Sequence, residues 1–156
     1  MPRRKRAGKQ DITGDPKYND CEISKFVNLL MWDGKKSLAY KIFYESMDII
    51  KEKTNQEPVS VFKKALGNVK PRVEVRARRV GGATYQIPVE VPAERSLALA
   101  IRWILGNVRV RKGKSVAEKL VDELMESAKG EGASVKKKED THKMAEANRA
   151  FAHYRW

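Results

Sequence analysis

The sequence predicts a mainly α protein, a helical bundle of five to six helices with an inserted, protruding two-stranded β-hairpin. Apolar residues recur at helical spacing through most of the chain, whereas strict alternation replaces that spacing between Pro71 and Pro92. At 156 residues a single domain is the default. We expect it to comprise a basic N-terminal arm (1–19), the first helices (20–70), the hairpin (71–92) and the remaining helices with a C-terminal tail (93–156).

The first 19 residues predict an arm that has no core of its own. They contain almost no apolar side chains, and no buried face can be drawn through them. Such a composition is typical of a segment that is disordered or lies extended on a surface. Ordered structure is expected to begin near Asp20. The arm carries the cations Arg3, Arg4, Lys5, Arg6 and Lys9 close to its start.

Three helices are expected before the hairpin. An i, i+3, i+4, i+7, i+8 pattern between Ile23 and Met31 predicts the first, which should end at Asp33. The second should span residues 36–53, and Pro58 suits the first turn of the third. The expected inward-facing residues are Ile23, Phe26, Val27, Leu30, Met31, Leu38, Ala39, Ile42, Phe43, Ile49, Ile50, Phe62, Ala65, Leu66 and Val69.

The alternating segment predicts a β-hairpin that turns at Gly81-Gly82. A glycine pair that cradles a phosphate would need a helix directly after it, and here a second alternating strand follows. Tyr85 lies beside the turn and has two open interpretations. It could stack on an unpaired base, or it could pack across the ribbon on Val75.

Helices return after Pro92. The fourth should bury one apolar face and present Arg95, Arg102 and Arg109 on the other. Ser115 opens the fifth with a capping box, and glycines at 130 and 132 stop it. The last segment, from about Ala133, is weakly amphipathic and should cross the surface and project its end. The expected apolar residues of these helices are Leu97, Ile101, Ile104, Leu105, Val108, Ala117, Leu120, Val121, Leu124, Met125, Ala128, Val135, Met144, Ala147 and Phe151.

A formal net charge of +13 restricts the partners to nucleic acid, an anionic membrane surface or an acidic protein. The cations cluster in the arm, at 70–79, at 109–114 and at 136–138, whereas the acids concentrate in the fifth helix, which is expected to face elsewhere. A two-stranded ribbon is marginally stable alone, so an arginine-rich ribbon predicts an anionic surface beneath it. The cluster at 136–138 is followed by Glu139 and Asp140, which favours a solvated face.

The residues that carry enzyme chemistry are poorly represented. Cys21 and two histidines eleven positions apart give no metal-ligand spacing. Ser-x-x-Lys pairs at Ser60 and Ser134 have no companion motif. The apolar runs are shorter than a membrane span, and the basic start is not followed by the apolar segment of a secretory signal. We therefore expect no catalysis, cofactor, metal, membrane or small-molecule substrate, and a reducing, cytosolic setting.

Four separated motifs resemble the small-subunit ribosomal protein S-seven family, bacterial type. In order they are PRRKR at 2–6, NLLMWDGKK at 28–36, KPRVEVRARRVGGATYQIPVEV at 70–91, and KKKED at 136–140 with MAEANRAFAHYRW at 144–156. The resemblance covers essentially the whole chain. It implies a helical protein with a protruding hairpin that binds the 3′ major domain of small-subunit ribosomal RNA and nucleates assembly of the subunit head. It also implies a cytoplasmic location in the ribosome, beside the exit site.

The same resemblance implies partners and contact residues. The partners are ribosomal RNA, exit-site transfer and messenger RNA, and neighbouring ribosomal proteins of the head and platform. The candidate ribosomal-RNA contacts are Arg3, Arg4, Lys5, Arg6, Lys9, Lys35, Lys36, Arg72, Arg76, Arg78, Arg79, Arg95, Arg102, Arg109, Arg111, Lys112 and Lys114. The candidates for the exit-site side are Gly81, Gly82, Tyr85, Lys143, Arg149, Tyr154, Arg155 and Trp156.

Two alternatives remain at this point. A DNA-bending architectural protein also joins a helical body to basic β-arms, but such proteins insert an apolar wedge between base steps, where this hairpin carries two glycines. An RNA-modifying or RNA-cleaving enzyme would need a catalytic cluster. Equal affinity for duplex DNA and ribosomal RNA would favour the first alternative, and RNA turnover that one substitution abolishes would favour the second.

Overall fold

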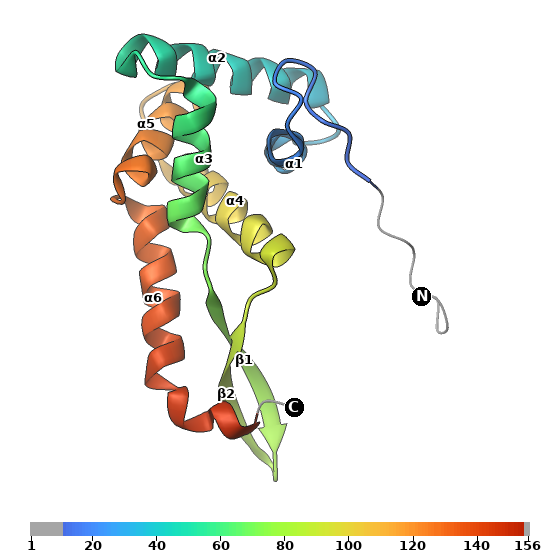
Figure 1. Cartoon of the computed structure of the whole chain (residues 1–156), viewed down its shortest axis with the longest axis vertical. Helices are drawn as coiled ribbons and strands as arrows, with labels where there is room; N and C mark the ends of the chain where they lie inside the picture. The colour runs from blue at the N-terminus through green and yellow to red at the C-terminus, as the bar shows by residue number, and fades with distance from the viewer. Residues whose placement is uncertain (1–10, 155–156) are drawn as a thin grey trace. The chain divides into compact units, whose positions relative to one another are not determined.

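The protein is mainly helical with one antiparallel hairpin, as a computed structural model that describes residues 11–154 shows (Figure 1). This confirms the predicted fold class. The chain divides into two compact units, residues 1–40 and 41–156, and each is described by itself. The elements are α1 (Cys21–Leu30), α2 (Lys36–Thr54), α3 (Pro58–Val69), β1 (Val73–Val80), β2 (Ala83–Glu90), α4 (Ala93–Val110), α5 (Val116–Lys129), α6 (Ala133–Ala147) and the 3-10 helix η1 (Arg149–Tyr154).

Residues 11–20, directly before α1, are ordered, in contrast to the prediction of an arm up to residue 19. Asp15 is buried, and its carboxylate accepts the backbone N–H groups of Lys17 and Tyr18 at 3.0 Å each. The Asn19 N–H donates to the Asp15 carbonyl oxygen at 2.7 Å. A polar segment thus folds through a local aspartate turn and needs no apolar face. The predicted arm residues 3–9 lie outside the described residues.

Helix α1 is capped by the Asp20 carboxylate, which accepts the N–H of Glu22 at 2.7 Å. The helix ends at Leu30, three residues before the predicted end at Asp33. The backbone leaves the helical conformation at Met31, where ψ is 138°. A turn follows in which Asp33 has φ +49° and Gly34 has φ +74°. Helix α2 then begins at Lys36 and continues into the second unit.

In the second unit, helices α2 to α5 form a close-packed core. The rings of Phe43 on α2 and Phe62 on α3 meet edge to face with centroids 5.5 Å apart. Asn68 on α3 donates to the carbonyl oxygens of Ser127 and Ala128 on α5, at 2.9 and 3.1 Å. Most of the predicted inward residues are buried, and Met47 joins them. Leu38, in the first unit, was predicted inward but is exposed. Of the apolar residues that mark the last helix, Met144 and Ala147 are exposed.

The hairpin turns through Gly81 and Gly82, whose φ values are +57° and +89°. Positive φ at both positions is the type I′ geometry that matches strand twist, and glycine adopts it without steric cost. This turn sets the register: Arg78 pairs with Tyr85, and Val75 pairs with Pro88. Paired residues point to the same side of a ribbon, and neighbours alternate. Tyr85 therefore points away from Val75, and of its two open interpretations the packing on Val75 is wrong.

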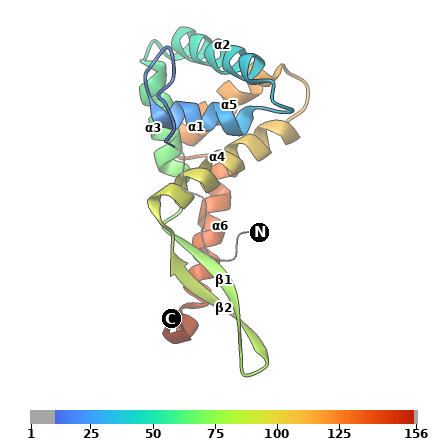
Figure 2. The same ribbon diagram turned by 90° about the vertical axis from the view of Figure 1, so that its right-hand side faces the viewer.

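Helix α6 runs beside the hairpin, and η1 folds back against β2 (Figures 1 and 2). The Tyr85 ring lies 5.2 Å from that of Phe151 and 5.3 Å from that of Tyr154, between centroids. Ile87, two residues along on the same side of β2, is fully buried. The end of the chain up to Tyr154 is therefore docked on the hairpin, whereas the sequence predicted that it projects.

Among the helices of residues 11–154, none combines the length and the apolar content that crossing a membrane requires. Within the same residues, no group of three or more His, Cys, Asp or Glu side chains could hold a metal ion.

Replacing Tyr85 with alanine should release η1 from β2 and leave the helical core folded. Aromatic pairs of this kind contribute about 0.5–1.5 kcal/mol each beyond their buried area. Hydrogen exchange followed by mass spectrometry should show reduced protection at 149–154 and unchanged protection in α3 and α5. The matched control is Gln86→Ala, because Gln86 is exposed on the other side of the ribbon. Equal protection of 149–154 in the Tyr85 variant and the natural chain would contradict the docking.

Candidate nucleic-acid interface

The base of the hairpin is held by a buried carboxylate. Glu74 is 7% exposed, and the Arg95 Nε on α4 lies 2.9 Å from each of its oxygens. The Arg76 Nε donates to the same carboxylate at 2.8 Å. Burial opposes ionisation of Glu74, yet the hydrogen bonds from Arg95 and Arg76 outweigh it and hold the pKa of Glu74 below its ordinary value. The charge of Glu74 therefore fixes β1 to α4.

The two arginines on Glu74 still face solvent in part. Their side chains are 50% exposed for Arg76 and 47% for Arg95. A guanidinium carries five donors, so each retains N–H groups that can reach a phosphate. Glu74 thus orients these cations and leaves them able to bind an anion.

Further along the hairpin, Arg78 and Arg79 are exposed. They point to opposite sides of the ribbon, because they are neighbours on one strand. On α4, Arg102 and Arg109 are exposed on the face opposite the buried Ile101 and Val108. The hairpin and the outer face of α4 therefore present cations on adjoining elements of one unit.

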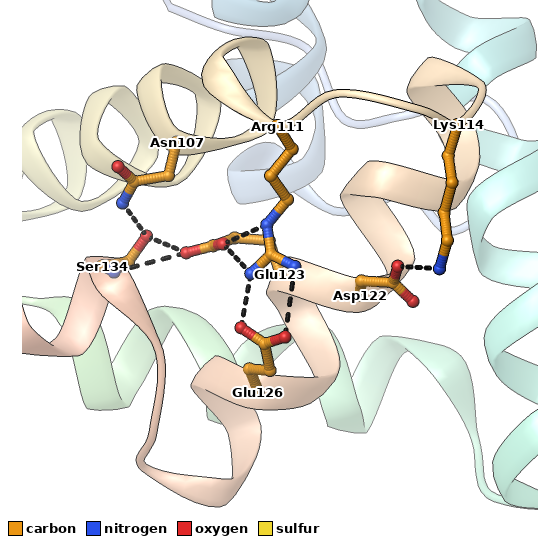
Figure 3. A network of polar contacts seen from close by, with 7 residues as sticks. All are labelled: Asn107, Arg111, Lys114, Asp122, Glu123, Glu126 and Ser134. Carbon is orange, nitrogen blue, oxygen red and sulfur yellow. Dashed lines mark hydrogen bonds and ion pairs between the residues drawn. The ribbon is translucent and has the colours of Figure 1, made fainter.

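A second network holds the loop between α4 and α5 (Figure 3). Arg111, at the end of α4, donates from Nε to Glu123 at 3.0 Å and from Nη1 to Glu126 at 3.1 Å. Its Nη2 contacts both carboxylates. Glu123 and Glu126 are three positions apart on α5 and therefore lie on one face. The hydrogen bonds to Glu126 and Glu123 raise the pKa of Arg111, with burial opposing them.

Glu123, on α5, also accepts hydrogen bonds from the first turn of α6. Its side chain is fully buried, and Oε1 accepts the Ser134 hydroxyl at 2.5 Å and the Ser134 backbone N–H at 3.3 Å. Asn107 on α4 donates to the same hydroxyl at 2.9 Å. Gly132 precedes α6 and has no side chain to cap it, so Glu123 supplies the acceptor that the first turn of α6 needs. One carboxylate joins three helices.

The sequence suggested that the acids of α5 face away from the cations. In the structure they pair with them. Lys114 donates to Asp122 at 2.6 Å, and Lys53 lies 3.8 Å from the same carboxylate. Glu118 completes the capping box with Ser115. The physical reason is the short α4–α5 loop, which brings residues 111–114 back alongside α5, so that Arg111 reaches Glu123 and Glu126 and Lys114 reaches Asp122 (Figure 3).

In the first unit, the cations Lys35 and Lys36 lie at the start of α2 and are exposed. The Lys35 N–H closes the turn on the Trp32 carbonyl oxygen at 2.9 Å. The Lys36 ammonium lies 5.7 Å from the centroid of the Tyr40 ring. The first turn of α2 contains no acid, so the positive helix terminus adds to these charges.

The remaining predicted contact residues are either exposed or outside the described residues. Arg72, Lys112, Lys143 and Arg149 are exposed, as are Gly81 and Gly82. Arg3, Arg4, Lys5, Arg6, Lys9, Arg155 and Trp156 lie outside the described residues. The carboxylates Glu74 and Glu123 were missed as partners; the signal for Glu74 is that it is the single acid in residues 70–79.

His142 joins α6 to the foot of the hairpin, a contact that sequence reasoning did not find. Its Nε2 accepts the backbone N–H of Arg72 at 3.0 Å, which requires that this nitrogen carries no proton. Burial lowers the pKa of His142, and the charges of Lys138 and Arg72 lower it further.

Comparison with known proteins points to one family. The family model described as ribosomal protein S7p/S5e matches residues 2–149. The small ribosomal subunit protein uS7 of Thermoanaerobacter pseudethanolicus (strain ATCC 33223 / 39E) is 60% identical over 156 residues, 100% of each chain. The protein of the same name from Chelativorans sp. (strain BNC1) is 57% identical to this chain over 156 residues, again 100% of each chain. In Thermotoga neapolitana (strain ATCC 49049 / DSM 4359 / NBRC 107923 / NS-E) the identity is 56% over 154 residues, 99% of each chain.

Replacing Glu123 with alanine should lower the free energy of unfolding by about 3 kcal/mol, because it strips a partner from Arg111 and the cap from α6. Urea unfolding followed by circular dichroism measures this. Glu126→Ala is the matched control: the Glu126 side chain is 42% exposed, so its removal should cost about 1 kcal/mol or less. Equal destabilisation in the two variants would contradict the network.

The His142 contact should make stability depend on pH. The folded pKa lies below the unfolded value near 6.5, so in this window the unfolded chain binds more protons, and acidification favours unfolding. The free energy of unfolding should therefore fall as pH decreases from 7.5 to 5.5. His142→Gln keeps an acceptor and should flatten that dependence, measured by urea unfolding. His153→Gln removes a histidine elsewhere and is the matched control; if it flattens the dependence instead, the assignment to His142 is wrong.

Proposed function

This chain belongs to the ribosomal protein S7p/S5e family, and on that basis we propose that it binds the 3′ major domain of small-subunit ribosomal RNA and nucleates assembly of the head. It is a structural constituent of the small ribosomal subunit and is located in the ribosome, in the cytoplasm. The family is structural rather than enzymatic.

The observation that carries the RNA-binding proposal is the anchored basic hairpin. Glu74 ties β1 to α4, so that the exposed arginines of both elements are presented by one scaffold. Arginine forks match phosphate geometry and release condensed counterions on binding. The major groove of A-form RNA is too narrow for side chains to read, so a shaped array of cations suits RNA better than base-edge contacts would.

The candidate RNA contacts divide into two groups. We propose that Arg72, Arg76, Arg78, Arg79, Arg95, Arg102, Arg109, Lys112, Lys35 and Lys36 contact phosphates, together with the predicted cations of residues 3–9. Arg111 is held by Glu123 and Glu126 and is 29% exposed. We assign it to keeping the α4–α5 loop in position. Lys114, which is paired with Asp122 but 54% exposed, stays among the contacts.

The exit-site side is proposed to be the end of the second unit where the hairpin meets the C-terminal segment. Tyr85, Phe151 and Tyr154 hold η1 against β2, which brings Arg149 and the segment after Lys143 to the hairpin (Figure 1). The glycines at 81 and 82 have no neighbour within 4 Å of a Cβ placed on them, so another backbone can approach closely there. Messenger RNA, transfer RNA and neighbouring head and platform proteins are the proposed occupants.

Arg79→Gln and Arg102→Gln should each weaken binding to a transcript of the 3′ major domain. Each should also reduce the slope of log affinity against log salt concentration by about 0.7–0.9 for every phosphate that the variant no longer neutralises. Filter binding or fluorescence anisotropy between about 50 and 200 mM salt measures both quantities.

Lys51→Gln provides the control, because Lys51 is an exposed cation of α2 outside the proposed contacts; it should leave the slope unchanged. A slope that falls equally in all three variants would show unspecific attraction. Equal affinity of the natural chain for duplex DNA and for this transcript would overturn the ribosomal-RNA proposal itself.

A further inference from the structure

An exposed tryptophan lies in the turn between α1 and α2. Trp32 is 64% exposed, which is unusual for a side chain that gains so much from burial. The Lys35 N–H bonds to the Trp32 carbonyl oxygen at 2.9 Å, and Asp33 and Gly34 both have positive φ. The turn is therefore of type I′, a defined geometry that brings the backbones of Trp32 and Lys35 together.

Apolar exposure is concentrated at this turn. Among the described residues, seven large apolar side chains are exposed, and three of them, Leu29, Trp32 and Leu38, fall within ten residues. Single exposed apolar residues are ordinary, but three within ten residues of the chain, one of them a tryptophan, mark a segment that another molecule covers.

The charges around the turn identify the chemistry of that molecule. Lys35 and Lys36 closely follow Trp32, and the α2 terminus adds partial positive charge. Asp33 is the one acid between residues 31 and 40. An aromatic face beside two cations fits a nucleotide, whose base is flat and apolar on its faces and whose phosphate is anionic. An apolar peptide would match Trp32 but would leave both cations without a counter-charge.

We propose that the turn is a nucleotide-binding site, in which Trp32 stacks on an unpaired base of the ribosomal RNA while Lys35 and Lys36 hold the adjoining phosphates. This rests on the proposed function, since it requires that the chain binds ribosomal RNA. It adds a preference for single-stranded RNA at one point, because a paired base offers no free face to the indole.

The test compares Trp32→Leu, which keeps apolar bulk without an aromatic face, with Trp32→Phe, which keeps the face. Binding to the 3′ major domain transcript should weaken about 5- to 150-fold for Trp32→Leu, the range of base–aromatic stacking. Trp32→Phe should restore most of the affinity. The salt slope should stay unchanged in both, whereas Lys35→Gln should lower it by about 0.7, the value for one single-strand phosphate contact.

A second readout is the fluorescence of tryptophan, which stacking on a base quenches. RNA should quench the natural chain more than Trp32→Phe, and the difference reports on Trp32 alone, because the two other tryptophans are common to both proteins. Circular dichroism confirms that each variant is folded.

The outcomes separate the two proposals. If the natural chain does not bind the transcript, the proposed function fails, and this inference fails with it. If the natural chain binds but Trp32→Leu binds equally well, only the stacking site is overturned. Weaker binding that Trp32→Phe does not restore, with no difference in quenching, also overturns stacking and indicates an apolar contact, such as one with a neighbouring protein.

Discussion

Two buried carboxylates, Glu74 and Glu123, fix the basic elements of the second unit to its helices. In a chain with a net charge of +13, repulsion among the cations destabilises the folded state unless the cations are spaced or paired. Glu74 pairs with Arg95 and Arg76, and Glu123 pairs with Arg111. Desolvating a carboxylate is costly, so such pairs add little net stability. They do impose one geometry, because removing the arginines would leave a buried carboxylate without compensation.

This constraint divides the arginines by what they touch. Arg111 is directed inward and joins the α4–α5 loop to the start of α6, through the shared partner Glu123. Arg79 and Arg102 are directed outward. Arg76 and Arg95 do both, since each binds Glu74 and remains about half exposed. A rigid array of cations loses less conformational entropy on binding RNA than flexible side chains would, which gives the internal ion pairs a function beyond stability.

Local signals in the sequence were sufficient to predict the helices, the capping box at Ser115 and the turn at Gly81-Gly82, because each is determined by residues a few positions apart. These local signals did not predict contacts between residues on different elements. The docking of Tyr154 on Tyr85 and the pairing of Arg111 with Glu123 depend on how the elements pack against one another in three dimensions. The side on which Tyr85 points follows from the predicted turn, because a two-residue turn fixes the register and the register decides which residues share a face. The sequence interpretation left that side open because it did not carry the turn through to the register. Binding to RNA was inferred from charge, hairpin and resemblance together, since charge alone does not select a partner.

The central claim is that inward arginines position the surface and outward arginines bind RNA. The most direct test replaces Arg111 and Glu123 together with methionine, which removes an ion pair and leaves the net charge unchanged. The variant also loses the acceptor that Glu123 provides at the start of α6, so circular dichroism must first show that it is folded. The salt dependence of binding to the 3′ major domain transcript should then have the same slope as in the natural chain. A slope smaller by about 0.7–0.9 would show that Arg111 contacts a phosphate, and would contradict the account.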